Sequence, residues 1–559
     1  MSISAAIHRS LFKDKDGGGG ARALSAIIKH RFLSFLIWQS LQSTLLLFLS
    51  KTLLLSLFTK YPFSPIFQSL VYFVCFHVSL LIVSVSLFFI SSAHPLPFAS
   101  PLEISLSFIR LIFVSGGEQS LLRTRVRVSL TFVLFVCLCA VSGAVSAISV
   151  CWGCDVYYYF DSGSSRVGAL GFRGFVIGLF YGLHYVYKQR WVFRFPIIQR
   201  PPFFSYKMGL PLSIGRALRF SAVGFALSGM LSFFLPNEYK SQSSVGKFIV
   251  EQIVFYLGSF VVILCWELSH HLHQVLHTKR FVFAPPKGSA AAETNPSEPL
   301  LATIEESTPN SLLQYLAYLD LCMVCENNVD SWRRAAFFEE TGETYRRVIA
   351  ACLRPLEQFT QKLAEGLECS SAEKSMQLSD QLTSPTERLA VLKLYESFFD
   401  AQLCAWCARV VASLTSRSRK EDKFGVAQLS GSNAAVISTL LSSLLAVETL
   451  MGKKTNVQSA HLMGPAGIKW ATVNTGRRES TAGAMGKIRG SPLYAKAYSM
   501  ADILKTSIYC IASAFHNEML NSGKAGLLEK DWIISSKPLY GTHELLLHKL
   551  RLFLDYQAN

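Results

Sequence analysis

The chain has 559 residues, of which 50% are hydrophobic and 16% charged, and it carries a formal net charge of +17. Residues 1–289 hold 26 Lys/Arg against 9 Asp/Glu, whereas residues 290–559 hold 28 of each, so the excess lies with the long apolar runs. Direct nucleic-acid binding is therefore disfavoured, because the charge-balanced half has no surplus of cations for phosphates.

The first half contains six apolar stretches long enough to cross a membrane. A hydrocarbon core about 30 Å thick takes roughly 20 residues of helix. The stretches cover residues 32–58, 66–92, 128–150, 167–186, 218–235 and 248–268. We predict a six-helix transmembrane domain over residues 32–281, preceded by a basic disordered tail over residues 1–31. Lys51 interrupts the first stretch, so that span could end near Ser50.

Basic residues alternate between the connections of these stretches. Six Lys/Arg precede the first stretch, and the five connections that follow hold one, four, one, six and two. Because positively charged loops stay on the cytosolic side, both termini are predicted to be cytosolic. Anionic lipid headgroups on that side are the expected counter-charge.

Glycines mark the fourth stretch as a packing helix. It contains Gly171, Gly174, Gly178 and Gly182, and the last three recur every four residues. They therefore line one helix face and allow a neighbouring backbone to approach closely.

Ionisable residues within spans are costly and indicate function or pairing. Arg173 and Glu251 are expected in the lumenal leaflet and are candidates for an ion pair. Arg219, with Arg216, enters the fifth span from the cytosol near the expected depth of Glu267. No charge is expected at a midplane, which disfavours a transporter.

A collar of polar residues surrounds Glu267 at the end of the sixth span: His270, His271, His273 and His277. The Glu-x-x-His spacing resembles half of a carboxylate-bridged metal site. No second copy of this motif exists in the sequence, so a polar collar at the interface is the favoured interpretation.

Cysteines suggest two further candidate sites. Cys151 and Cys154 lie in a predicted lumenal loop and are candidates for a disulfide. The pairs Cys322/Cys325 and Cys404/Cys407 each face one side of a helix and together could bind zinc. Small core side chains explain these pairs more simply, and we expect no metal and no cofactor.

The second half is predicted to be helical and soluble. Residues 282–309 are rich in Pro and Ala and are interpreted as a linker. A soluble α-helical, partner-binding domain follows over residues 310–559, with helices near 311–327, 331–367, 384–417, 433–451, 491–521 and 541–556. Ser384 and Thr542 are the expected N-caps of two of them. Residues 452–490 form a basic, glycine-rich loop, expected to be solvated or to contact a partner. The predicted fold class is therefore all-α throughout.

The sequence contains none of the common catalytic fingerprints, such as GxSxG, a P-loop or HExxH. We therefore expect no enzyme.

Several unusual sequence motifs between the third and fifth spans carry a family resemblance. They comprise Cys151-Trp-Gly-Cys154, the glycine-bearing stretch 167–187, Gln189-Arg190-Trp191, Phe195-Pro196 and Gln199-Arg200-Pro201. With six spans and a helical second half, this chain resembles the integral-membrane nucleoporins, the six-span pore-membrane proteins named for the nuclear division cycle. It is similar to plant members of that family.

The resemblance implies a scaffold of the nuclear pore membrane ring that anchors the nuclear pore complex in the envelope and supports pore assembly. It also implies soluble nucleoporin partners, namely the propeller protein aladin and an inner-ring nucleoporin with an RRM-like fold, and other pore-membrane proteins. It implies no catalytic residue. The alternative is a polytopic endoplasmic reticulum enzyme or carrier that acts on lipids at Glu267 and the histidine collar.

Overall fold

A computed structural model describes residues 19–58, 66–95, 120–151, 163–196, 199–234, 245–285, 288–376, 393–452, 492–534 and 536–558. Within these ranges all the regular secondary-structure elements are helices, which confirms the predicted all-α class. One isolated β-bridge pairs Ser92 with Val192. The chain divides into two compact units, Met1–Arg280 and Phe281–Asn559.

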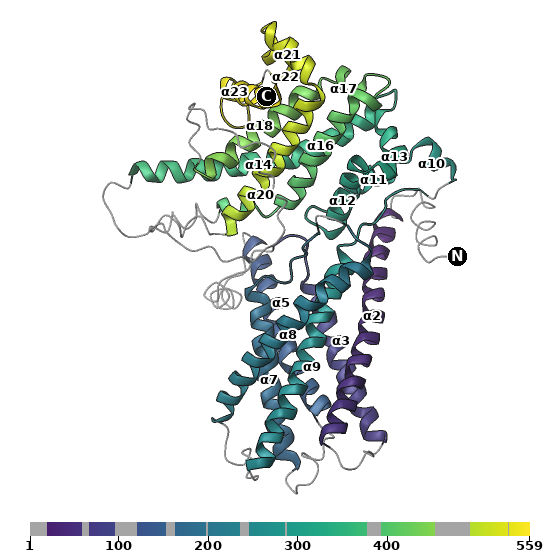
Figure 1. The fold of residues 1–559 in the computed structure, drawn as a ribbon, viewed down its shortest axis with the longest axis vertical. Coiled ribbons are helices and arrows are strands. Elements are labelled where there is room, and N and C mark those ends of the chain that lie inside the picture. The colour runs from purple at the N-terminus through teal and green to yellow at the C-terminus, as the bar shows by residue number, and fades with distance from the viewer. Residues whose placement is uncertain are drawn as a thin grey trace. The chain divides into compact units, whose positions relative to one another are not determined.

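Unit 1 contains six long helices that run side by side as one bundle (Figure 1). They are α2 Gly19–Phe58, α3 Ile66–Ile90, α5 Ser120–Cys151, α7 Gly163–Tyr187, α8 Pro202–Ser232 and α9 Val245–His277. Each contains a segment long and apolar enough to cross a membrane. The most extensive contact joins α5 to α7, and α9 contacts α2, α5 and α8.

The bundle buries small polar side chains and exposes large apolar ones. Leu41 and Phe48 on α2 are 62% and 65% exposed. In contrast, Ser79 is buried and lies 2.6 Å from the hydroxyl of Ser146 and accepts a hydrogen bond from Ser142 at its carbonyl oxygen. In lipid there is no hydrophobic force between helices, so small residues and internal hydrogen bonds hold them together. This distribution fits a bundle whose outer surface faces acyl chains.

Two helices extend beyond the apolar stretches that predict them. Helix α2 begins at Gly19, inside the segment expected as a disordered tail, and Arg31 donates two 2.7 Å hydrogen bonds, to the carbonyl oxygens of His277 and Lys279. These bonds satisfy carbonyl groups at the end of α9 and give the start of α2 a fixed partner. Helix α8 begins at Pro202, well before the predicted start of the fifth span, because proline suits the first turn of a helix.

Unit 2 is a second helical body with shorter elements. Its main helices are α11 Glu298–Glu306, α12 Leu312–Glu326, α14 Glu343–Met376, α16 Ala401–Glu421, α18 Ser432–Leu450, α20 Pro492–Ala514 and α23 His543–Ala558. Its short helices are α10 Ala290–Thr294, η2 Asn328–Asp330, α13 Ser331–Ala335, η3 Ala336–Phe338, α17 Val426–Leu429, α21 His516–Lys524 and α22 Leu528–Trp532. Helix α16 contacts α12, α14 and α20, so it lies centrally within the unit.

Helix α18 is a seventh helix that could span a membrane by length and composition. However, 78% of its apolar window is buried, against 22–44% for the six helices of unit 1. Since α14, α16, α20 and α23 cover it, α18 is a core helix of unit 2.

Several helix boundaries in unit 2 differ from the sequence prediction. The segment expected as a linker contains α10 and α11, and α11 buries Leu300 and Leu301. The helix predicted over 331–367 is interrupted, because Gly342 adopts a positive φ of 69° before α14. The predicted cap Thr542 accepts a hydrogen bond from the backbone N–H of Leu545 at 3.3 Å. Ser384 and nearly all of the basic loop, residues 453–490, lie outside the described residues.

Candidate functional site

The glycine face of α7 packs directly against α5. A Cβ atom added at Gly178 would lie less than 3.0 Å from the backbone of Cys139 and Ala140, and one at Gly174 would clash with Ala147 and with the carbonyl oxygen of Gly143. Gly182 is nearly as close to Val136, whereas Gly171 meets only the side chain of Ile148. Three of the four predicted packing glycines thus form a seam in which two backbones nearly touch.

The polar turn after α7 is tied to α9 by a buried ion pair. The guanidinium of Arg190 donates to both oxygens of Glu267, at 2.6 and 2.7 Å. Their side chains are 10% and 1% exposed. Such fork-to-fork geometry is the strongest form of this interaction. Glu267 therefore pairs with Arg190, and the expected partner Arg219 instead lines a neighbouring cavity.

The turn that presents Arg190 is itself fixed on both sides. Gln189 has a positive φ of 49°, and the N–H of Arg190 donates to the carbonyl oxygen of Tyr185 at 3.1 Å. The next residue, Trp191, is fully buried, and its ring lies 5.0 Å from that of Phe132. The Gln189-Arg190-Trp191 motif thus has a structural role, because its side chains connect the end of α7 to α9 and α5.

Each collar histidine has its own hydrogen-bonding neighbour. Nδ1 of His270 lies 3.0 Å from the Tyr185 hydroxyl, and Nε2 of His273 lies 3.0 Å from the Ser91 hydroxyl. Nε2 of His271 lies 3.1 Å from the carbonyl oxygen of Tyr206. Nδ1 of His277 lies 3.0 Å from the carbonyl oxygen of His273, and its ring stacks on Phe193. Among the described residues, no group of three or more His, Cys, Asp or Glu side chains could hold a metal ion. The collar joins α9 to its neighbours.

The remaining predicted residues of unit 1 take different places. The guanidinium of Arg173 lies 3.8 Å from the ring centroid of Phe255 on α9. Glu251 is buried on the same helix. Cys151 is buried with its Sγ 3.9 Å from the carbonyl oxygen of Val254, whereas Cys154 lies outside the described residues. The Arg173–Glu251 pair and the Cys151–Cys154 disulfide therefore stay predictions.

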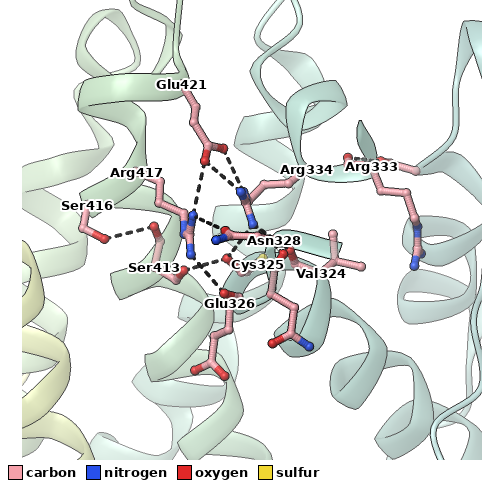
Figure 2. Close-up of polar contacts among 12 residues, drawn as sticks. Val324, Cys325, Glu326, Asn328, Arg333, Arg334, Ser413, Ser416, Arg417 and Glu421 are labelled. Atoms are coloured by element: carbon pink, nitrogen blue, oxygen red, sulfur yellow. Dashed lines mark hydrogen bonds and ion pairs between the residues drawn. The ribbon is translucent and has the colours of Figure 1, made fainter. Parts of the chain in front are cut away.

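In unit 2, two arginines close the carboxyl end of α12 (Figure 2). Buried Arg334 donates to Glu421 at 2.7 and 2.8 Å and to the carbonyl oxygens of Val324, Cys325 and Asn327 at 2.8–3.4 Å. Arg417 donates to the carbonyl oxygen of Glu326 at 2.9 Å and to the carboxylate of Glu421 at 3.3 Å. The last carbonyl groups of a helix lack partners within it, so these arginines cap α12 and hold it to α16.

A second buried pair anchors the start of unit 2. Arg333 and Asp320 are 1% and 0% exposed and meet at 2.8 Å. The same arginine donates to the carbonyl oxygen of Phe283 at 3.0 Å, and Asp320 accepts from the N–H of Phe283 at 2.9 Å. The consecutive pair Arg333-Arg334 is not singled out at the sequence level, because nothing in the local pattern marks these two arginines as buried.

The CxxC cysteines are core residues of unit 2. Cys322, Cys325, Cys404 and Cys407 are all buried, on α12 and α16. Burial raises the pKa of the Cys325 and Cys404 thiols. This opposes the thiolate form that zinc requires, so the geometry favours packing over metal binding.

Comparison with known proteins places these features in a family. A family model described as "Nucleoporin protein Ndc1-Nup" matches residues 26–399, which is more than half of the chain. The match covers the helices of unit 1 from residue 26 of α2 onward, the ion pair of Arg190 with Glu267 and unit 2 as far as α14. No curated protein matches the chain. With its six long apolar helices and this match, the chain belongs to the Ndc1-Nup nucleoporin family and is a multi-pass membrane protein of the nuclear envelope and pore.

Proposed function

We propose that this protein is a transmembrane scaffold that anchors the nuclear pore complex in the nuclear envelope and supports pore assembly and insertion. The single observation that carries the proposal is the family match, which runs from the membrane bundle into unit 2. One chain thereby links lipid to a folded helical body. We also propose that the protein is a plant-like member of the family, on the basis of its sequence resemblance.

The interior of unit 1 supports a structural role. Glu267 is engaged by Arg190, and His270 by Tyr185, so the two residues that a lipid-modifying enzyme would use already have partners within the bundle. The glycine seam between α5 and α7 has no room for a further methyl group at Gly178. These contacts are typical of a rigid anchor and disfavour the alternative enzyme.

Unit 2 is the proposed partner-binding part, with soluble nucleoporins of the propeller class and of the RRM-like inner-ring class as partners. Other pore-membrane proteins are further proposed partners. Unit 2 exposes large apolar side chains, among them Val329 and Leu429, which are 88% and 85% exposed.

Both termini are proposed to face the cytosol and the pore. The alternation of basic residues supports this orientation. Glycosylation acceptors inserted after residue 58 or 235 should be modified in the lumen, whereas an acceptor at the C-terminus should stay unmodified. Modification of the C-terminal acceptor alone would show that the orientation is the reverse of the one proposed.

The test of scaffold function compares capture of soluble nucleoporins by the full chain and by a chain that ends at Arg280. The shortened chain retains the whole of unit 1. We expect it to reach the envelope but to lose the soluble nucleoporins. Equal recovery with both chains would refute the assignment of partner binding to unit 2.

A matched control separates the folded surface from the basic loop. In this control a Gly/Ser segment of equal length replaces residues 453–490 of the full chain. We expect the soluble nucleoporins to be retained, because the described helices of unit 2 carry the proposed contacts. Their loss in this control would assign binding to the basic loop instead.

A further inference from the structure

A cavity of about 850 Å³ opens among α7, α8, α9 and the segment that joins α7 to α8. Its wall is held by direct hydrogen bonds. The Gln274 side chain accepts from the N–H of Arg194 at 3.1 Å, and the Gln199 side chain accepts from the N–H of Arg280 at 3.2 Å. His271 closes one side against Tyr206 of α8. The cavity is therefore formed in advance of any ligand.

The lining is strongly cationic. Seven of its described residues are Lys or Arg, and none of the described lining residues is Asp or Glu. Within the part of the chain that the structure describes, Glu267 is the only carboxylate paired with a lining cation, and it binds Arg190. The other six lining cations have no carboxylate partner among the described residues: Lys188, Arg194, Arg200, Arg216, Arg219 and Lys279.

Two of these cations lie on α8, a helix long and apolar enough to cross a membrane. Arg216 and Arg219 belong to the span Pro202–Ser232 and are three residues apart, so they lie on one face of α8. A charged side chain within a span is costly unless it meets an opposite charge or water. Because no described carboxylate pairs with either arginine, a bound anion is a candidate for the counter-charge.

The other part of the lining is apolar and lies beside exposed apolar surface. Phe220, Val275 and Met208 line the cavity along with the cations. On α8, which carries Met208 and Phe220, the side chains of Phe203 and Phe204 are 70% and 56% exposed. A ligand with an anionic head and an apolar body matches this wall. Arginine forks suit phosphate oxygens in particular, because guanidinium can donate two parallel hydrogen bonds.

We propose that this cavity binds the phosphorylated headgroup of an anionic phospholipid, with Arg216 and Arg219 as its central contacts. Six lining cations without a described carboxylate partner favour a headgroup with more than one negative charge, such as a phosphorylated inositol lipid. The phosphate chemistry is shared with soluble phosphates, and the apolar wall favours the lipid. The inference concerns unit 1 alone and holds whichever soluble nucleoporins bind unit 2.

The test uses the full chain in nanodiscs of phosphatidylcholine that contain a small fraction of bis-phosphorylated inositol lipid or of phosphatidylserine. Retained lipid is counted by native mass spectrometry, and its affinity is obtained by titration. The R216Q/R219Q variant should lower the affinity for the inositol lipid by about tenfold or more, since two charge-assisted contacts are lost.

The matched control is K29Q/K207Q, which removes two exposed charges that do not line the cavity. Its affinity should stay within about twofold of the wild type. An equal loss in both variants, or equal retention of neutral and anionic lipids by the wild type, would overturn the proposal. Tighter, Arg216-dependent binding of inorganic phosphate or of the free inositol phosphate headgroup would overturn the lipid assignment in favour of a soluble ligand.

A second variant keeps the proposal testable where R216Q/R219Q fails to fold. R194Q/K279Q removes two exposed cations at the rim of the cavity, outside the spans. It should fold like K29Q/K207Q and lower the affinity for the inositol lipid severalfold. Unchanged affinity of this variant would count against the cavity as the binding site.

Discussion

Arg190 donates hydrogen bonds to both carboxylate oxygens of Glu267, at 2.6 and 2.7 Å, and so joins the turn after α7 to α9. Both side chains are nearly excluded from solvent. A buried pair of this kind contributes little to stability relative to apolar residues, but each partner depends strongly on the other.

Loss of either partner should therefore destabilise unit 1. We expect R190Q or E267Q to lower the free energy of unfolding by roughly 3–5 kcal/mol, because one charge stays buried without its partner. The double variant R190M/E267L should recover most of this loss. Thermal unfolding in detergent measures the effect, with K207Q as an exposed control. Single variants that unfold like the control would show that the pair is dispensable.

The glycine seam predicts a sharp contrast between two alanine substitutions. G178A should cost roughly 1–3 kcal/mol, because its methyl group would collide with the backbone of α5. G229A on α8 has no atom within 4 Å of its added methyl group and should be neutral or slightly stabilising. The two unfolding transitions should be compared in the same detergent. Similar transitions for both variants would refute close packing at the seam.

Arg334 should be essential for the end of α12. R334Q removes the two bonds to Glu421 and the cap on the carbonyl groups of α12, and should cost roughly 3–5 kcal/mol because of its burial. Hydrogen exchange in the last turn of α12 should accelerate. The control R346Q breaks an ion pair whose partners are 61% and 63% exposed, and should change stability by less than about 1 kcal/mol. Unaltered exchange in R334Q would contradict the capping role.

The same network predicts acid sensitivity. Burial alone would raise the pKa of Glu421, but the hydrogen bonds and charges of Arg334, and then those of Arg417, outweigh it and lower the pKa. A carboxylate whose pKa is lower in the folded state contributes its full stability above its unfolded value, about 4.3, and loses it as the pH falls through the folded value. E421Q should therefore be less stable than the wild type at neutral pH.

This difference between E421Q and the wild type should shrink as the pH falls below about 4. Hydrogen exchange of α12 and α16 in the full chain, measured from pH 7 downward, gives the comparison. A difference that stays constant across the whole range would show that Glu421 is not stabilised in its ionised form.

The sequence by itself determined that the chain is all-α and that its first half holds six helices long and apolar enough to cross a membrane. These properties depend on the length of each apolar run and on local helix preferences, which a single segment expresses without its neighbours. The glycine spacing within α7 likewise predicted which face of that helix packs closely.

Only the tertiary structure decided which residues meet. Arg216 and Arg219 have a similar expected depth to Glu267 and lie on α8, a direct neighbour of α9, yet Glu267 pairs with Arg190 of the turn after α7. The sequence likewise contained no indication that the α7 glycines would pack against α5. Helix ends in unit 2 depend on long-range contacts, as at α11, where buried Leu300 and Leu301 order a segment whose composition suggests a linker. Pairing across a bundle is a property of packing, and side-chain spacing along one chain does not encode it.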